Sequence, residues 1–98
     1  MKQGGTLVHG RMEIPDKNQS ILNHAWVQYG DFIIDPANDI SARKWSMEES
    51  GIHYIPESIY TDEEAMIMLA RTGNYGKWYE SEVIDILGRG IVNDPSLL

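Results

Sequence analysis

Apolar and polar residues alternate in three stretches of the N-terminal half of the chain, and this period of two is typical of β-strands. The pattern predicts strands over about residues 7–14, 22–29 and 32–35. The turn-forming run over residues 15–20 separates the first two strands. Gly30 and Asp31 fit a two-residue type II′ hairpin loop between the second and third. We therefore expect a three-stranded antiparallel meander.

The two-residue loop also fixes the register of the second hairpin. Val27 then lies opposite Ile34, and His24 lies opposite Ala37, which places Asp35 diagonal to His24 on the same face. One face carries His24, Trp26, Gln28, Ile33 and Asp35, and the other carries Ala25, Val27, Tyr29, Phe32 and Ile34. We expect the second, more apolar face to pack on the core and the first to form a polar and aromatic groove.

The C-terminal half of the chain carries helix signals. Thr61 and Glu64 match a capping box, and Gly73 fits the C-terminal end of the helix that they begin. The apolar spacing over residues 78–87 predicts a second helix, which Gly88 ends. The buried stripe of the first helix is expected to consist of Ala65, Met66 and Leu69.

The segment between the hairpin and the first long helix is less regular. Residues 37–44 are expected to form an irregular connection. Ser46 and Glu49 match a capping box for a helix of one or two turns, and residues 52–55 can add a short edge strand. The sequence thus predicts one α+β domain over residues 1–98, with a small antiparallel sheet of three or four strands and two main helices packed on one face.

Composition and charge narrow the classes of function. The chain has no cysteine, which excludes disulfides, thiolate metal sites and a cysteine nucleophile. The N-terminus lacks the apolar core of a signal peptide, and no apolar run is long enough to span a membrane, so we expect a cytoplasmic protein. The net charge of −7 lies in residues 46–98, with three basic and ten acidic residues. This balance argues against direct nucleic-acid binding.

Two short motifs resemble a known superfamily. The chain reads His24-Ala25-Trp26-Val27, then a turn, then Ile34-Asp35-Pro36, and Leu7-Val8-His9-Gly10 lies upstream. These residues resemble the histidine and aspartate strands of transglutaminase-like and other papain-fold cysteine enzymes. The resemblance covers about residues 7–36. It implies that His24 is a general base and that Asp35 orients it.

The nucleophile of that superfamily has no counterpart in this sequence. Its cysteine begins a helix upstream of the two strands, whereas residues 1–23 contain no cysteine and read as a strand and a turn. Ser20 and Thr6 are the only upstream hydroxyls, and Ser20 lies in a predicted turn. We therefore expect a truncated, papain-like pseudoenzyme without independent catalysis and without a cofactor. It would bind a protein or a small molecule in the groove beside His24, and Arg11, Trp26, Gln28, Tyr75 and Trp78 are the expected binding residues.

Several alternatives remain open at this level. His24 and Asp35 can serve an active hydrolase or acyl transferase with an unusual or partner-supplied nucleophile, or they can form a purely structural pair. His9, His24 and Asp35, with His53, offer ligands for a metal, although no tight metal-binding spacing is present. Finally, residues 48–64 and 80–85 can make an acidic inhibitor of the kind that mobile elements encode, which would occupy a basic surface. The oligomeric state is open.

Overall fold

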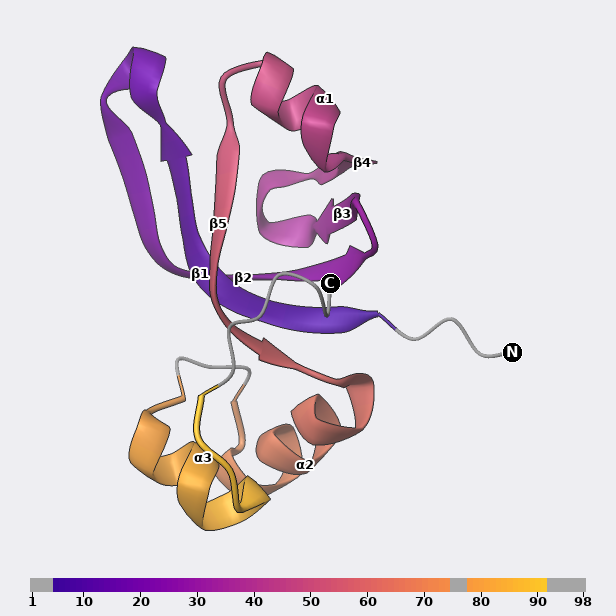
Figure 1. Ribbon diagram of the computed structural model, residues 1–98, viewed down its shortest axis with the longest axis vertical. Coiled ribbons are helices and arrows are strands. Elements are labelled where there is room, and N and C mark those ends of the chain that lie inside the picture. Colours follow the sequence, from indigo (N-terminus) through magenta and orange to yellow (C-terminus); the bar gives the residue numbers. More distant parts are fainter. Residues whose placement is uncertain (1–4, 75–77, 92–98) are drawn as a thin grey trace.

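The computed structural model describes residues 5–74 and 78–91 and shows an antiparallel sheet of five strands in the order β4-β3-β2-β1-β5 (Figure 1). The strands are β1 (Thr6–Ile14), β2 (Gln19–Tyr29), β3 (Phe32–Asp35), β4 (Ile40–Arg43) and β5 (His53–Tyr60). The α-helices are α1 (Lys44–Glu49), α2 (Asp62–Thr72) and α3 (Glu80–Leu87). The α+β class is confirmed, and the sheet has five strands where three or four were expected.

The predicted meander of β1, β2 and β3 is confirmed, and so is the register of the second hairpin. Val27 pairs with Ile34, and Tyr29 pairs with Phe32. In the loop between these strands, Gly30 has a φ of 62°. Asp31 does not share this positive φ, as a type II′ turn requires.

A β-bulge interrupts the pairing of β1 with β2. Gly10 pairs with His24 and Met12 pairs with Ile21, so β2 places two residues opposite Arg11. Asn23, one of these two residues, has a φ of 54°. The bulge lies directly before His24, so it changes the faces of the residues that precede this histidine in β2 and not the relation of His24 to the hairpin.

Two short helices of 3-10 type, η1 (Pro15–Lys17) and η2 (Pro36–Asn38), end the strands that precede them. Each begins with a proline and is followed by a residue in the left-handed region, Asn18 after η1 and Asp39 after η2. The turn at η2 returns the chain to β3, where β4 pairs with it. The expectation of an irregular connection over residues 37–44 was therefore wrong. The expected short strand over residues 52–55 is longer, because β5 pairs with β1 as an edge strand.

The two long helices match their sequence signals. Thr61 and Glu64 form the capping box of α2, and Gly73 and Gly88 end α2 and α3 in the left-handed conformation. The prediction of the buried stripe of α2 was partly wrong, because Met68 is fully buried whereas Met66 is 67% exposed. The short helix α1 begins two residues before Ser46 and has no side-chain cap, so the capping box expected at Ser46 and Glu49 does not form.

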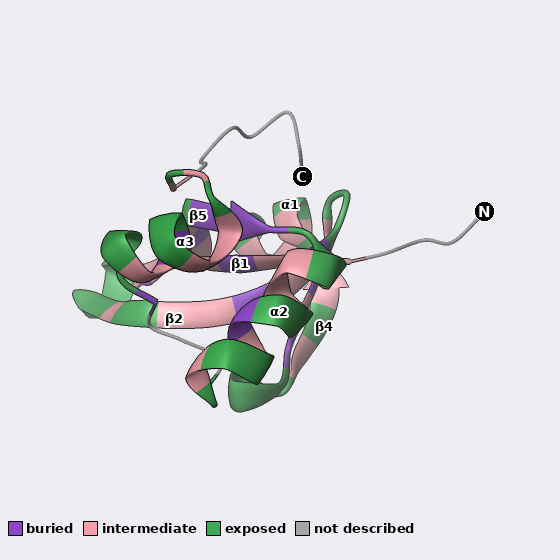
Figure 2. Ribbon diagram, turned by 90° about the horizontal axis from the view of Figure 1, so that it is seen from below, coloured by how far each residue is buried: buried purple, intermediate pink, exposed green. Residues whose placement is uncertain are grey.

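The buried residues form two clusters. The sheet cluster consists of Val8, Met12, Trp26, Ile33, Tyr54 and Ile59, and Met47 of α1 packs against it. The helix cluster consists of Tyr60, Met68, Trp78 and Val83, and Leu7 of β1 packs against it. Because consecutive residues of a strand point to opposite faces, Leu7 and Val8 place the two clusters on opposite faces of β1. Figure 2 shows the buried residues along the strands and the exposed surfaces of α2 and α3.

The face expected to form a groove is the face that packs in the sheet cluster. Trp26 is 1% exposed and Asp35 is 0% exposed, whereas Tyr29, on the face expected to be buried, is 42% exposed. The expectation followed the apolar content of each face and was wrong. Polar groups on the buried face bond one another, as in the hydrogen bond from Trp26 Nε1 to Gln28 Oε1 at 3.0 Å. Because these groups are hydrogen-bonded, removing them from water costs much less free energy.

No helix among residues 5–74 and 78–91 has the length and the apolar character that crossing a membrane requires.

Candidate functional site

His24 and Asp35 form a hydrogen-bonded pair at the end of the second hairpin. His24 Nε2 lies 2.7 Å from Asp35 Oδ2. The hairpin loop sets the register that brings the two residues to one face, and the bulge before His24 leaves that register intact. The expected proximity of the pair is therefore confirmed. The side chain of His24 is 10% exposed, and that of Asp35 is 0% exposed.

Two further side chains donate hydrogen bonds to the same oxygen of Asp35. Asn38 Nδ2, from η2, lies 2.9 Å from Oδ2, and the hydroxyl of Tyr54, from β5, lies 2.8 Å from it. Asn38 Nδ2 also lies 3.2 Å from His24 Nε2, so the two nitrogens converge on one carboxylate oxygen. The other oxygen, Oδ1, is buried and has no hydrogen-bond partner among the residues that the structure describes. One carboxylate thus connects β2, β3, η2 and β5.

The network keeps Asp35 ionised despite its burial. Burial alone would raise the pKa of Asp35, but the hydrogen bonds from His24, Asn38 and Tyr54 outweigh it and hold this pKa below its ordinary value. The pKa of Tyr54 shifts in the opposite direction. Burial and the hydrogen bond to Asp35 raise the pKa of the phenol well above its usual range. Tyr54 therefore keeps its proton and donates a hydrogen bond to the Asp35 carboxylate.

This geometry sets the chemistry that His24 can perform. Because an ionised carboxylate only accepts hydrogen bonds, the neutral imidazole carries its hydrogen on Nε2 and its lone pair on Nδ1. A histidine in this tautomer can take a proton from a nucleophile placed beside Nδ1, while Asp35 stabilises the resulting imidazolium. The arrangement is suited to general-base chemistry.

The hydroxyl that the sequence offered as a nucleophile lies too far along the strand. Ser20 pairs with Glu13 in the ladder, and it precedes His24 by four residues of β2. A bulge lies between them, and their partners in β1, Gly10 and Glu13, are three residues apart, so at roughly 3.3 Å per residue the two positions stand on the order of 10 Å apart. Ser20 therefore cannot give a proton to His24.

The other expected binding residues do not gather beside His24. The exception is Trp26, whose ring centroid lies 6.1 Å from that of His24. Trp26 and Gln28 lie on the same face of β2, but they are buried and bonded to each other, and Gln28 Nε2 donates to the Gly30 carbonyl at 2.9 Å. Arg11 binds Glu13 and Glu57, each at 2.9 Å, rather than Asp35. The prediction of an open groove lined by these three residues was therefore wrong, because Trp26 and Gln28 are buried and Arg11 is paired with glutamates.

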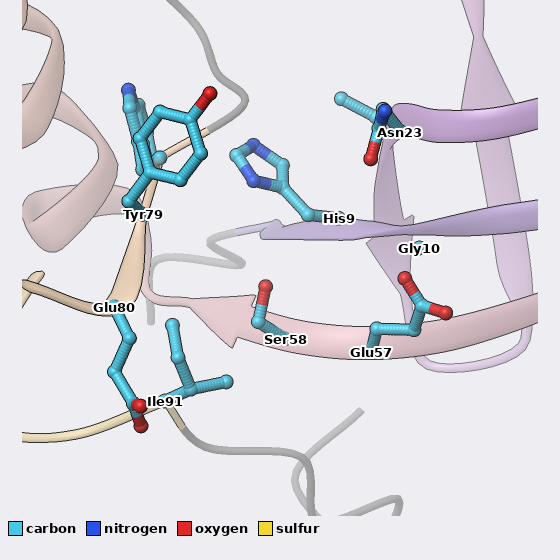
Figure 3. Close-up of a pocket in the computed structure, with 10 residues that line it drawn as sticks. His9, Gly10, Asn23, Glu57, Ser58, Tyr79, Glu80 and Ile91 are labelled. Atoms are coloured by element: carbon cyan, nitrogen blue, oxygen red, sulfur yellow. The ribbon is translucent and has the colours of Figure 1, made fainter.

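Trp78 lies on the opposite face of the sheet, where its ring packs against His9 and Tyr60. It helps to line a pocket there together with residues of β1, β5 and the start of α3 (Figure 3). The expectation that Trp78 walls the site around His24 was therefore wrong. Tyr75, the residue expected beside it, lies outside the described residues.

The metal-binding alternative fails on the same geometry. His9 pairs with Ala25, whereas His24 pairs with Gly10, so the two histidines emerge on opposite faces of the sheet. Within the described part of the chain, no group of three histidine, aspartate or glutamate side chains could hold a metal ion. His24 and Asp35 thus form a two-residue site without a third ligand.

Asn38 and Tyr54 are the site residues that sequence reasoning missed. Asn38 was assigned only to an irregular connection, although an asparagine three residues after the aspartate is a local signal that could have been used. Tyr54 lies 19 residues from Asp35, and only the pairing of β5 with β1 brings its hydroxyl to the carboxylate. No spacing in the sequence encodes that contact.

The scan against protein-family models, the search of curated proteins and the search of solved structures each found no match to this chain.

Proposed function

We propose that this chain provides the histidine and aspartate half of an acyl-transfer or hydrolytic site on a transglutaminase-like scaffold. Its nucleophile would come from another chain or from a segment outside the described residues. The observation that carries the proposal is the 2.7 Å contact between His24 Nε2 and a fully buried Asp35. Binding beside Trp26 and Asp35 is less well supported, because both side chains are buried.

The surroundings of the pair support a role as a base. Three donors from three elements fix the carboxylate, which in turn fixes the plane and the tautomer of the imidazole. A positioned base of this kind accelerates proton abstraction by about 10²–10⁴-fold when the nucleophile is also positioned. When the nucleophile diffuses freely, the rate acceleration cannot exceed the lower end of that range.

A small thiol can stand in for the missing nucleophile. The experiment follows the thiolysis of an activated ester, p-nitrophenyl acetate, by 2-mercaptoethanol in the presence of the protein. We expect a rate about tenfold above that given by the same concentration of free imidazole, because the positioned base deprotonates the thiol as it attacks. His24→Gln should remove the acceleration.

The chain offers its own matched control. His53 lies in β5 and contributes nothing to the network around Asp35, so His53→Gln should leave the rate unchanged. Equal rates for the wild type and His24→Gln would contradict the proposal. Equal losses in His24→Gln and His53→Gln would indicate nonspecific catalysis by imidazole.

A structural role is the second candidate function, and one observation favours it. Asp35 ties together β2, β3, η2 and β5 through one buried oxygen, as a purely structural pair would. The chain would then be a non-catalytic scaffold. Under this alternative, Asp35→Asn lowers stability, and no His24-dependent thiolysis is observed in the wild type.

A further inference from the structure

We propose that the cavity on the face opposite His24 binds a small organic cation, such as an alkylammonium group. This cavity has a volume of about 230 Å³. Its lining includes His9, Glu57, Ser58, Trp78, Tyr79 and Glu80. Figure 3 shows the ring of Tyr79 beside His9 of β1, with Glu57 and Ser58 on β5, and it shows the side chain of Glu80 extending from the start of α3 towards Ile91. The proposal is independent of the function proposed for His24.

The aromatic part of the lining is held in place by its own contacts. Trp78 Nε1 donates to the carbonyl of Asn74 at 3.0 Å. The Trp78 ring packs edge-on against Tyr60, with centroids 4.9 Å apart, and lies 4.8 Å from the ring of His9. Trp78 is 4% exposed, so the wall that it forms is already built before any ligand arrives.

Tyr79 supplies the outer part of the aromatic lining. It follows Trp78 in the chain and is 62% exposed, although it borders the cavity. The face of an aromatic ring attracts a cation through the ring quadrupole, and aromatic cages for quaternary ammonium ligands use this attraction. A cavity with one rigid and one exposed ring is suited to such a group.

The charged residues of the lining have the sign that a cation needs. The described lining contains two glutamates and neither lysine nor arginine. Glu57 is bonded to Arg11 at 2.9 Å, which offsets part of its charge, whereas no ion pair to Glu80 is present among the described residues. Glu80 is therefore the main counter-charge of the cavity.

The start of α3 does not reverse this sign. The N-terminus of a helix carries about half a positive charge. The first turn of α3 contains Glu80 and Glu82, which outweigh it, and the whole chain carries −7. An anionic ligand would meet a net negative lining.

The size of the cavity limits the ligand. Pockets for drug-sized molecules occupy about 300–1,000 Å³. At about 230 Å³, this cavity accommodates a smaller group, either a free cation or the side chain of a basic residue on a partner. Two probes separate these sources: choline, and the peptide Gly-Lys-Gly with blocked termini.

The test measures binding to the full chain by NMR titration of the indole N–H signals. The protein has three tryptophans, at positions 26, 45 and 78. We expect the Trp78 signal to shift saturably with choline or with the peptide. The neutral isostere 3,3-dimethylbutan-1-ol should bind at least threefold more weakly, because it lacks the charge. Trp45 is 56% exposed and far along the chain, so it reports nonspecific association.

Variants at the rim test the two attractive features separately. Glu80→Gln should weaken binding about threefold to fivefold, as expected for an exposed charge pair. Tyr79→Ala should weaken it by a similar factor, whereas Tyr79→Phe, which keeps the ring, should not. Glu63→Gln, an exposed acidic change in α2, is the matched control and should leave binding unchanged.

Three results would overturn the proposal. They are the absence of saturable binding by both cations, equal affinity for the neutral isostere, and a shift of Trp45 that parallels that of Trp78. Binding of choline alone indicates a free small cation, and binding of the peptide indicates a basic side chain. Both of these results support the proposal.

Discussion

At the scale of single residues, Asp35 connects the local chemistry of the site with the stability of the fold. Its Oδ2 accepts hydrogen bonds from His24, Asn38 and Tyr54 at 2.7–2.9 Å. Removing a charge from such a buried network leaves donors without an ionised acceptor. The same carboxylate therefore positions the imidazole and stabilises the packing of β5 against the hairpin.

Asp35→Asn should lower the free energy of unfolding by about 2–3 kcal/mol, because the buried, charged acceptor of three hydrogen bonds is lost. Urea denaturation at pH 7 measures this change. Asp39→Asn is the control, since Asp39 is exposed and has a φ of 55°, a conformation that asparagine also tolerates. Equal stability of Asp35→Asn and the wild type would show that the network is not a support.

The sequence could predict that His24 and Asp35 lie close together, but not that their face of the sheet is buried. The loop at Gly30 and strand parity were enough to place His24 near Asp35. Burial of that face was not predictable, because it depends on polar groups that satisfy one another and on Tyr54, which β5 brings from a distant part of the chain. The apolar content of one hairpin says nothing about hydrogen-bonding partners that other parts of the chain supply.

At the scale of elements, Gly10 sets how closely β1 and β5 approach. A Cβ at this position would collide with the carbonyl oxygen of Ile55 and would lie 3.0 Å from Pro56 Cα. The backbones of β1 and β5 therefore approach closely at Gly10, where only a glycine fits. The pairing of β1 with β5 shifts register at the same place.

Gly10→Ala should destabilise the protein by about 3 kcal/mol, because backbone on the neighbouring strand must move to admit the methyl group. Gly30→Ala is the matched control, since Gly30 has a φ of 62° and no atom within 4 Å of the added Cβ. It should cost only about 1 kcal/mol, for the left-handed backbone alone. Thermal unfolding of both variants checks the difference, and equal losses would rule out the collision.

Elements with strong local signals were predictable, and short ones were not. α2 and α3 have glycine C-caps and apolar spacing, and β1 to β3 have alternation and turns. β4 has only four residues, and its strand conformation comes from pairing with β3. α1 begins without a side-chain cap, so its start depends on contacts with the sheet rather than on Ser46.

At the scale of the whole molecule, an ion pair links the start of α2 to the segment that follows α3. Arg89, just after α3, donates to both oxygens of Glu64 at 2.7 Å. Its guanidinium also lies over the ring of Tyr60 and donates to the carbonyl of Ile59 at 3.2 Å. The hydrogen bond to Arg89 lowers the pKa of Glu64, against the opposing effect of burial.

Stability should therefore fall in acid on both sides of the sheet. The folded-state pKa values of Asp35 and Glu64 lie below their ordinary values, so the stabilisation is complete above about pH 4.5 and is lost as pH falls through the folded values. Urea midpoints between pH 7 and pH 2 measure this. Asp35→Asn and Glu64→Gln should each reduce the fall of the urea midpoint at acid pH. The same fall in both variants as in the wild type would show that these two carboxylates do not cause the loss of stability.

The acidic-inhibitor alternative stays a prediction, and the fold gives many of its charges a local role. Asp62, Glu63 and Glu64 lie in the first turn of α2, and Glu80 and Glu82 lie in that of α3. Carboxylates at these positions stabilise the helix N-terminus. The excess charge of the C-terminal half therefore has a structural cause that needs no basic partner.

The short helix α1 has a consequence for how copies of the protein meet. It contacts both outermost strands, β4 and β5, and so lies between the two open edges of the sheet. β5 also contains Pro56, which has no N–H to offer an incoming strand, and β4 is only four residues long. Both edges are thus poor templates for strand addition, which should protect the chain against edge-to-edge aggregation despite its large sheet.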